Sequence, residues 1–209
     1  MAEEIYQDVV NDAGFFRVLS RIDREMAEKT RKERCPYCGG PLHYACYARV
    51  GCGGPPDLPS SVRTRFSLCC GREGCRRRTL PPSCLFFGRR WYWGVVVLVV
   101  SAWRHLEPTG MCVERLGLLF GVSRATVNRW LWYFREVFPN SVLWQRVRGR
   151  VSPVVRNDNL PRTLIEHLVV AHKSIAGGLR AALQLLAAGQ ARFPGVDPFH
   201  AKGDFMVRN

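Results

Sequence analysis

Two short cysteine pairs constrain the fold of this chain more than any other feature. They are Cys35-x2-Cys38 and Cys70-x4-Cys75, and two short loops can bring four such thiolates together around a tetrahedral zinc ion. The surrounding residues 34–88 are rich in Gly and Pro, which excludes a regular helix, and they keep only short β-suited pieces. Because so small a unit cannot bury an adequate apolar core, we expect two or three short strands in a zinc ribbon that the metal stabilises.

The identity of one zinc ligand is ambiguous from the sequence. Cys69 and Cys70 are adjacent, and neighbouring residues of an extended segment point to opposite faces, so only one of them is expected to ligate. We predict Cys70, because Cys70 to Cys75 makes a compact Gly-containing loop, and Cys69 is the alternate. Further alternative ligands are His43, Cys46 and Cys52. Four thiolates leave no open coordination position, so the expected cofactor is one structural Zn²⁺. The competing interpretation is that the cysteines are reduced, buried and packed as small apolar residues.

The charge of the chain favours a polyanionic partner. The formal net charge is +14, and residues 31–90 carry twelve basic and three acidic side chains, whereas residues 1–30 carry four basic and seven acidic ones. Three arginines, Arg76 to Arg78, directly follow Cys75. The excess of positive charge therefore collects beside the predicted metal site, where we expect these arginines to contact phosphate.

Cysteine usage and hydropathy indicate a reduced, cytoplasmic protein that does not enter a membrane. The chain has nine cysteines, and its acidic N-terminus lacks an apolar leader, so we expect free thiols or metal ligands instead of a disulfide framework. The longest apolar run, residues 91–103, is too short to span a bilayer. We expect that run to be buried in the core.

The predicted fold class is mainly α with a small β zinc ribbon, built from several modules. Residues 1–33 are expected to form an N-terminal amphipathic helix, whose partner is either its own domain or a second copy in a homodimer. Residues 34–88 would form the zinc ribbon, residues 89–140 a three-helix helix-turn-helix, and residues 141–209 a helical region with a loose tail from Phe193. The remaining helices are predicted at residues 89–106, 109–120, 124–138, 161–173 and 178–191, the last two separated by Gly177-Gly178.

The segment around Gly121-Val-Ser123 carries the helix-turn-helix pattern. Gly121 suits the left-handed backbone of the turn, and Ser123 is a good N-cap for the second helix. The apolar residues placed to pack the two helices together are Leu116, Phe120, Val122, Val127 and Trp130. This arrangement exposes Arg124, Ala125, Asn128 and Arg129, and leaves Thr126 and Arg135 to meet phosphate or solvent. Arg can pair with guanine and Asn with adenine in the major groove; the alternative is an ordinary helical hairpin whose arginines are solvated.

The combination of these motifs resembles the N-terminal DNA-binding portion of insertion-sequence transposases, in a standalone form. The resemblance covers residues 34–138 and is carried by the cysteine pairs, by the basic run from Arg76 to Ser83 and by Gly121 to Trp130. It implies double-stranded DNA as partner and a bacterial, nucleoid-associated protein of a mobile element. The DNA-binding residues we predict are Arg76, Arg77, Arg78, Ser123, Arg124, Thr126, Asn128 and Arg129.

The catalytic half of a transposase is not expected in this chain. The resemblance would imply a domain with three metal-binding carboxylates. After the helix-turn-helix the acidic residues are Glu136, Asp158, Glu166, Asp197 and Asp204, without an alternating strand and helix pattern. We therefore predict no catalytic residues and an accessory or regulatory DNA-binding protein. Alternatives are an adaptor that docks on a larger nuclease, recombinase or transposase, a transposase fragment, and an active transposase or nuclease.

Overall fold

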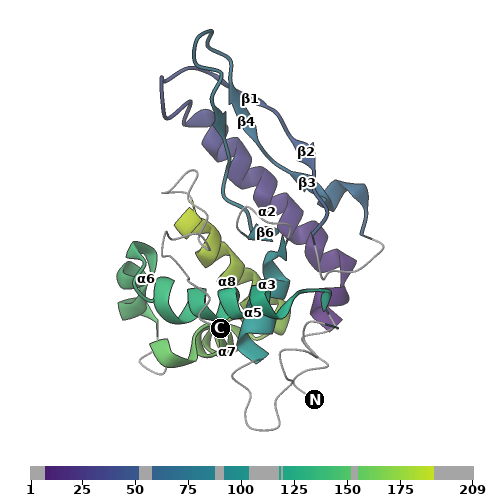
Figure 1. The fold of residues 1–209 in the computed structure, drawn as a ribbon, viewed down its shortest axis with the longest axis vertical. Helices are drawn as coiled ribbons and strands as arrows, with labels where there is room; N and C mark the ends of the chain where they lie inside the picture. The colour runs from purple at the N-terminus through teal and green to yellow at the C-terminus, as the bar shows by residue number, and fades with distance from the viewer. Residues whose placement is uncertain are drawn as a thin grey trace, which may run out of the picture.

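The computed structural model describes residues 8–51, 58–87, 92–103, 118, 120–151 and 155–190. This part of the chain is mainly helical and also contains small antiparallel sheets. Its secondary-structure content therefore agrees with the predicted fold class. The molecule is elongated: a three-stranded sheet lies toward one end of the long axis, and most helices gather in the other half (Figure 1). No helix of the described residues is both long and apolar enough to cross a membrane.

Helix α2 (Ala13–Lys32) runs obliquely to the long axis and connects the two halves (Figure 1). The predicted single helix over residues 1–33 is wrong at Asp12, where a helical segment over residues 8–11 ends. Asp12 has an extended backbone, and its side chain accepts a 2.7 Å hydrogen bond from the Gly14 amide. This residue therefore caps a new helix, because its carboxylate satisfies an amide that has no partner within the helix.

The residues around the cysteine pairs form two small sheets. Strands β1 (Leu42–Tyr44), β4 (Leu68–Cys70) and β5 (Arg78–Thr79) make an antiparallel sheet in the order β1-β4-β5, with Leu42 opposite Cys70. Strands β2 (Tyr47–Ala48) and β3 (Thr64–Arg65) form a second antiparallel pair. The short 3₁₀ turn η1 (Ser60–Val62) precedes β3. The short strands expected within residues 34–88 are thus present.

The apolar run that precedes the helix-turn-helix segment is buried. Strands β6 (Phe86–Phe87) and β7 (Tyr92–Trp93) form an antiparallel pair, and β7 leads directly into α3 (Gly94–Trp103). All but one residue of α3 is buried, which confirms that this run lies in the core. The predicted helical start at residue 89 is wrong, because Tyr92 and Trp93 are extended and pair with β6.

The C-terminal half of the described chain is helical. The helices are α5 (Arg124–Trp132), which continues into a π-helical turn η2 (Tyr133–Val137), α6 (Val142–Val147), α7 (Arg162–His172) and α8 (Ile175–Gln190); short 3₁₀ turns are η3 (Arg148–Arg150) and η4 (Asn157–Asn159). The predicted helix at 109–120 lies outside the described residues except for Leu118 and Phe120, which are both helical. The predicted loose tail also lies outside them.

Gly177 and Gly178 do not separate the last two helices. They lie inside α8, and the break falls at Lys173, whose φ of 52° is left-handed. A Cβ atom on Gly178 would approach the backbone of Val169 in α7 to 2.6 Å. These glycines therefore allow α7 and α8 to pack closely, which a rule that treats Gly as a helix breaker does not foresee.

One apolar cluster joins all four predicted segments. It includes Phe16 of α2, Leu85, Val97 of α3 and Leu183 of α8, each no more than 2% exposed. The described residues therefore share one main core across the predicted boundaries. A separate small cluster contains only Cys35, Leu42, Leu68 and Cys70, with Cys38 and Cys75 packed against it.

A buried carboxylate connects α2 to the segment before β6. Asp23 is 1% exposed and accepts hydrogen bonds from the Ser83 hydroxyl and from the amide of Cys84, at 2.6 Å for the latter. Arg65, itself 6% exposed, donates to the carbonyl of Pro81 at 2.6 Å and stands close enough to act on Asp23 electrostatically. Sequence reasoning did not find this polar contact, because its members are distant in the chain.

Candidate metal centre and candidate DNA-contact residues

The two cysteine pairs sit on two loops of similar construction. In the first loop the Cys35 amide donates to the Gly40 carbonyl at 2.9 Å, and in the second the Cys70 amide donates to the Arg77 carbonyl at 3.0 Å. The residue after the second cysteine is left-handed in both loops, with φ of 69° at Gly39 and 44° at Arg76. This turn lets the next amide face the sulfur of the preceding cysteine.

The four sulfurs have the spacing of a tetrahedral thiolate site. The Sγ atoms of Cys35, Cys38, Cys70 and Cys75 all lie within 4.8 Å of one another. The Cys35–Cys75 and Cys38–Cys70 sulfur pairs are 3.8 and 3.5 Å apart. Zinc bound to sulfur at about 2.3 Å in a tetrahedron separates the sulfurs by about 3.8 Å. The geometry therefore fits one four-coordinate metal ion, and all four predicted ligands are brought together.

Backbone amides act on the thiols of this cluster. The Gly40 amide lowers the pKa of Cys38 to about 7. At Cys70 the Arg72 amide donates to the sulfur at 3.4 Å, and this hydrogen bond lowers the pKa of the thiol. Burial and the neighbouring thiols outweigh it and raise the pKa of Cys70 to about 12. Without a metal, the cluster therefore favours the ionised form of the Cys38 thiol and disfavours ionisation of the Cys70 thiol. A bound cation would remove that resistance, because each thiolate then faces a positive charge.

The other candidate ligands lie apart from the cluster. Cys69 turns to the outer face of the sheet opposite His43, and its sulfur lies 3.4 Å from the Arg76 carbonyl. Cys46 is exposed, and its thiol points toward the carbonyl of Ser67. Cys52 is outside the described residues. Only one of the two adjacent cysteines joins the cluster, as strand alternation predicted, and it is Cys70, the one chosen for its compact loop to Cys75.

The surroundings of the cluster contribute little apolar stabilisation. Leu42 and Leu68 are the fully aliphatic members of its small core. Burying two leucines contributes about 3–6 kcal/mol. Ordering even ten residues costs more than that, at about 1–2 kcal/mol each. Metal ligation is therefore the main available source of stability for this end of the molecule.

The three arginines that follow Cys75 are exposed. Arg76, Arg77 and Arg78 lie on the surface, and no carboxylate of the described residues pairs with them. Arg77 and Arg78 stack over tyrosine rings, at 4.7 Å from the centroid of Tyr37 and 5.6 Å from that of Tyr47. Sequence reasoning missed these pairs; the only signal was the presence of tyrosines within the basic segment.

The predicted second helix of the helix-turn-helix is present as α5. Gly121 has a φ of 59°, and Ser123 caps the helix by accepting from the Thr126 amide at 3.3 Å. The apolar residues predicted to pack here, Phe120, Val122, Val127 and Trp130, are buried, whereas Leu116 lies outside the described residues. Arg124, Ala125 and Asn128 are exposed, as predicted.

Two of the predicted DNA-contact residues on α5 have internal roles. The prediction that Thr126 meets phosphate or solvent is wrong, because its side chain is 3% exposed and its hydroxyl lies 3.1 Å from that of Tyr92. Arg129 is half-buried and donates to the Thr126 hydroxyl at 3.0 Å. The Thr126 side chain is buried because it faces Tyr92 of β7, the strand that leads into the core helix α3. Arg135 is exposed and pairs with Glu136 at 3.1 Å.

The fold and the site together define a mainly helical protein with a four-cysteine candidate metal centre and a basic surface beside it. Comparisons with protein-family models, with curated proteins and with solved structures found no match for this chain.

Proposed function

We propose that this chain is a zinc-containing DNA-binding protein related to transposition machinery, with an accessory or regulatory role. The observation that carries the proposal is the four-thiol cluster, spaced for a tetrahedral metal, with three exposed arginines on the chain that leaves its last cysteine. A ligand set of thiolates alone suits zinc and leaves no position for substrate. The metal would be structural, held by Cys35, Cys38, Cys70 and Cys75.

The proposed base contacts come from the exposed side of α5. Asn128 and Arg124 lie on that side, at the spacing of one helical turn. An Asn can bond two edges of adenine and an Arg two edges of guanine. Arg129 would then orient this surface through its bond to Thr126, instead of reading a base.

The proposed phosphate contacts come from the other half of the molecule. The strands that hold Cys70 and Arg78 lie toward one end of the long axis, and α5 lies in the opposite half (Figure 1). The arginines after Cys75 would therefore contact a different stretch of nucleic acid from the one that α5 contacts. Contacts to phosphate add affinity without sequence preference.

The test is a selection of binding sites from random duplexes, followed by variants. Asn128→Ala should lower affinity for the selected site about tenfold, the value of one lost bidentate base contact, and leave scrambled duplex unchanged. Arg76→Ala should weaken both duplexes equally and reduce the salt dependence. Gln184→Ala, an exposed amide on α8, is the matched control. Failure to select any sequence, or equal losses for Asn128→Ala on both duplexes, would contradict the proposal.

The proposal includes no catalytic centre. In the described part of the chain, the carboxylates after α5 each pair with a nearby arginine: Glu136 with Arg135, Asp158 with Arg156 and Glu166 with Arg162. Asp197 and Asp204 lie outside the described residues.

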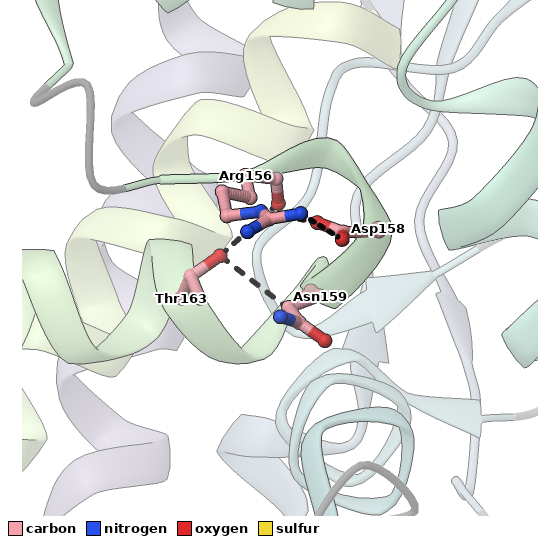
Figure 2. A network of polar contacts seen from close by, with 4 residues as sticks. All are labelled: Arg156, Asp158, Asn159 and Thr163. Atoms are coloured by element: carbon pink, nitrogen blue, oxygen red, sulfur yellow. Dashed lines mark hydrogen bonds and ion pairs between the residues drawn. The ribbon is translucent and has the colours of Figure 1, made fainter.

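Figure 2 shows the turn that holds Asp158. Arg156 donates to both carboxylate oxygens, at 3.2 and 2.9 Å, and the Thr163 hydroxyl lies within 3.5 Å of the Arg156 and Asn159 carbonyls. These contacts give Asp158 a role in holding the turn before α7. Metal-dependent DNA cleavage that Asp158→Ala abolishes would contradict a non-catalytic role.

A further inference from the structure

Three arginine–tyrosine pairs gather around the two small sheets near the cysteine cluster. Arg77 lies over Tyr37, Arg78 over Tyr47 and Arg31 over Tyr44, with guanidinium carbons 4.7, 5.6 and 6.0 Å from the ring centroids. Tyr37 belongs to the first cysteine loop and Arg77 to the second. The closest of the three pairs therefore bridges the two loops that hold the metal site.

The Tyr37–Arg77 pair is both exposed and rigidly mounted. Tyr37 is 47% exposed, and Arg77 is also on the surface. The Arg77 carbonyl accepts from the Cys70 amide at 3.0 Å, and its own amide bonds to the Cys75 sulfur. The backbone that carries the guanidinium is thus held in place, which lowers the ordering cost for a ligand that stacks on the pair.

The Tyr44–Arg31 pair is a natural comparison. Tyr44 is similarly exposed, at 44%, but its hydroxyl donates to Glu28 at 2.7 Å, and Arg31 pairs with the same carboxylate at 3.1 Å. The Glu28 charge neutralises this pair and repels phosphate. Arg77 has no carboxylate partner among the described residues, so the charge at Tyr37 remains available to an anion.

The geometry points to a binding site for unpaired nucleobases at the Tyr37–Arg77 pair, and hence for single-stranded nucleic acid. A base offers a π-face that stacks on tyrosine or on a guanidinium plane, and its phosphates would meet exposed Arg72 and Arg76. A duplex keeps its bases stacked on one another and presents only phosphates to this surface. The site is therefore distinct from the duplex contact proposed for α5, and does not depend on it.

The experiment measures the affinity of the full, zinc-loaded chain for labelled oligothymidylate and oligouridylate of about a dozen nucleotides. A duplex of equal length and polyglutamate serve as comparison ligands. Tyr37→Ala should weaken single-strand binding about tenfold, the value of one lost stacked base, and Tyr37→Phe should restore it. Tyr44→Ala, the matched control, should leave the affinity unchanged. Oligothymidylate and oligouridylate together show whether the source of the bases is DNA or RNA.

Zinc content is measured for each variant, because Tyr37 lies between two ligands. If Tyr37→Ala loses zinc, the test is the difference in oligothymidylate affinity between Tyr37→Leu and Tyr37→Phe. Leucine keeps the apolar bulk but has no π-face. Retained affinity in Tyr37→Leu, or binding of polyglutamate as strong as that of oligothymidylate, would overturn the inference. Asn128→Ala separates the two proposals: it should not affect oligothymidylate, so a failed duplex selection alongside Tyr37-dependent single-strand binding would refute only the function proposed for α5.

Discussion

The buried Asp23 predicts an unusual dependence of stability on pH. Burial raises the pKa of this carboxyl from 3.8 to about 6, although the Ser83 hydroxyl, the Cys84 and Leu85 amides and the Arg65 charge all lower it. The native protein therefore binds the proton more tightly than the unfolded chain does. The stabilising contribution of this group is fully present below about pH 4 and is lost as the pH rises through about 6.

The magnitude follows from the same two values. The interval between 3.8 and about 6 corresponds to about 3 kcal/mol of unfolding free energy. Asp23→Asn keeps the shape and the acceptor oxygen for the Cys84 amide but does not titrate. We therefore expect the unfolding free energy of the wild type, minus that of Asp23→Asn, to fall by about 2 kcal/mol between pH 4 and pH 7, since the unfolded carboxyl is already partly ionised at pH 4.

The assay is urea unfolding of both proteins across that pH range. Both keep the four thiols, so the pH dependence of metal binding cancels in the difference. Glu25→Gln removes an exposed carboxylate from the same helix and serves as the baseline. If the unfolding free energy of the wild type, minus that of Asp23→Asn, does not change with pH, the reasoning is refuted. A difference that rises with pH would show that Arg65 outweighs burial and holds Asp23 ionised.

Two further predictions concern α5 and the metal. Ser123→Ala should cost about 1 kcal/mol in urea unfolding, because the Thr126 amide loses its capping oxygen; no loss would mean that the cap is absent in solution. Removal of metal by a chelator should abolish hydrogen-exchange protection in β1, β4 and β5 while α3 stays protected, since the small cysteine cluster is separate from the main core. Equal loss in α3 would contradict that separation.

The parts of the structure that the sequence predicted depend on short-range patterns. The cysteines of each pair lie a few residues apart, so strand alternation predicted a single ligand from Cys69 and Cys70, and the compact loop to Cys75 selected Cys70. The start of α5 was equally local, because a left-handed glycine and a capping serine lie two residues apart, at Gly121 and Ser123. The burial of Gly94–Trp103 followed from its long apolar run, which only Gly94 and Ser101 interrupt.

The parts that the sequence did not predict depend on contacts between distant residues. Gly178 was taken as a break, but it lies inside α8 where that helix packs closely on Val169. Asp23 looked like one more charged residue on an amphipathic helix until the turn at Ser83 and Cys84 was placed against it. Thr126 has the same position in the pattern as a phosphate contact, and only the approach of Tyr92 shows that it is buried.

The central claim is one structural zinc ion held by Cys35, Cys38, Cys70 and Cys75. The measurement that tests it most directly is the zinc content of freshly purified, folded wild type, Cys70→Ser and Cys69→Ser. The account predicts about one equivalent of zinc in wild type and in Cys69→Ser, and a large loss in Cys70→Ser. Less than about half an equivalent in the wild type, or equal losses in the two variants, would contradict it.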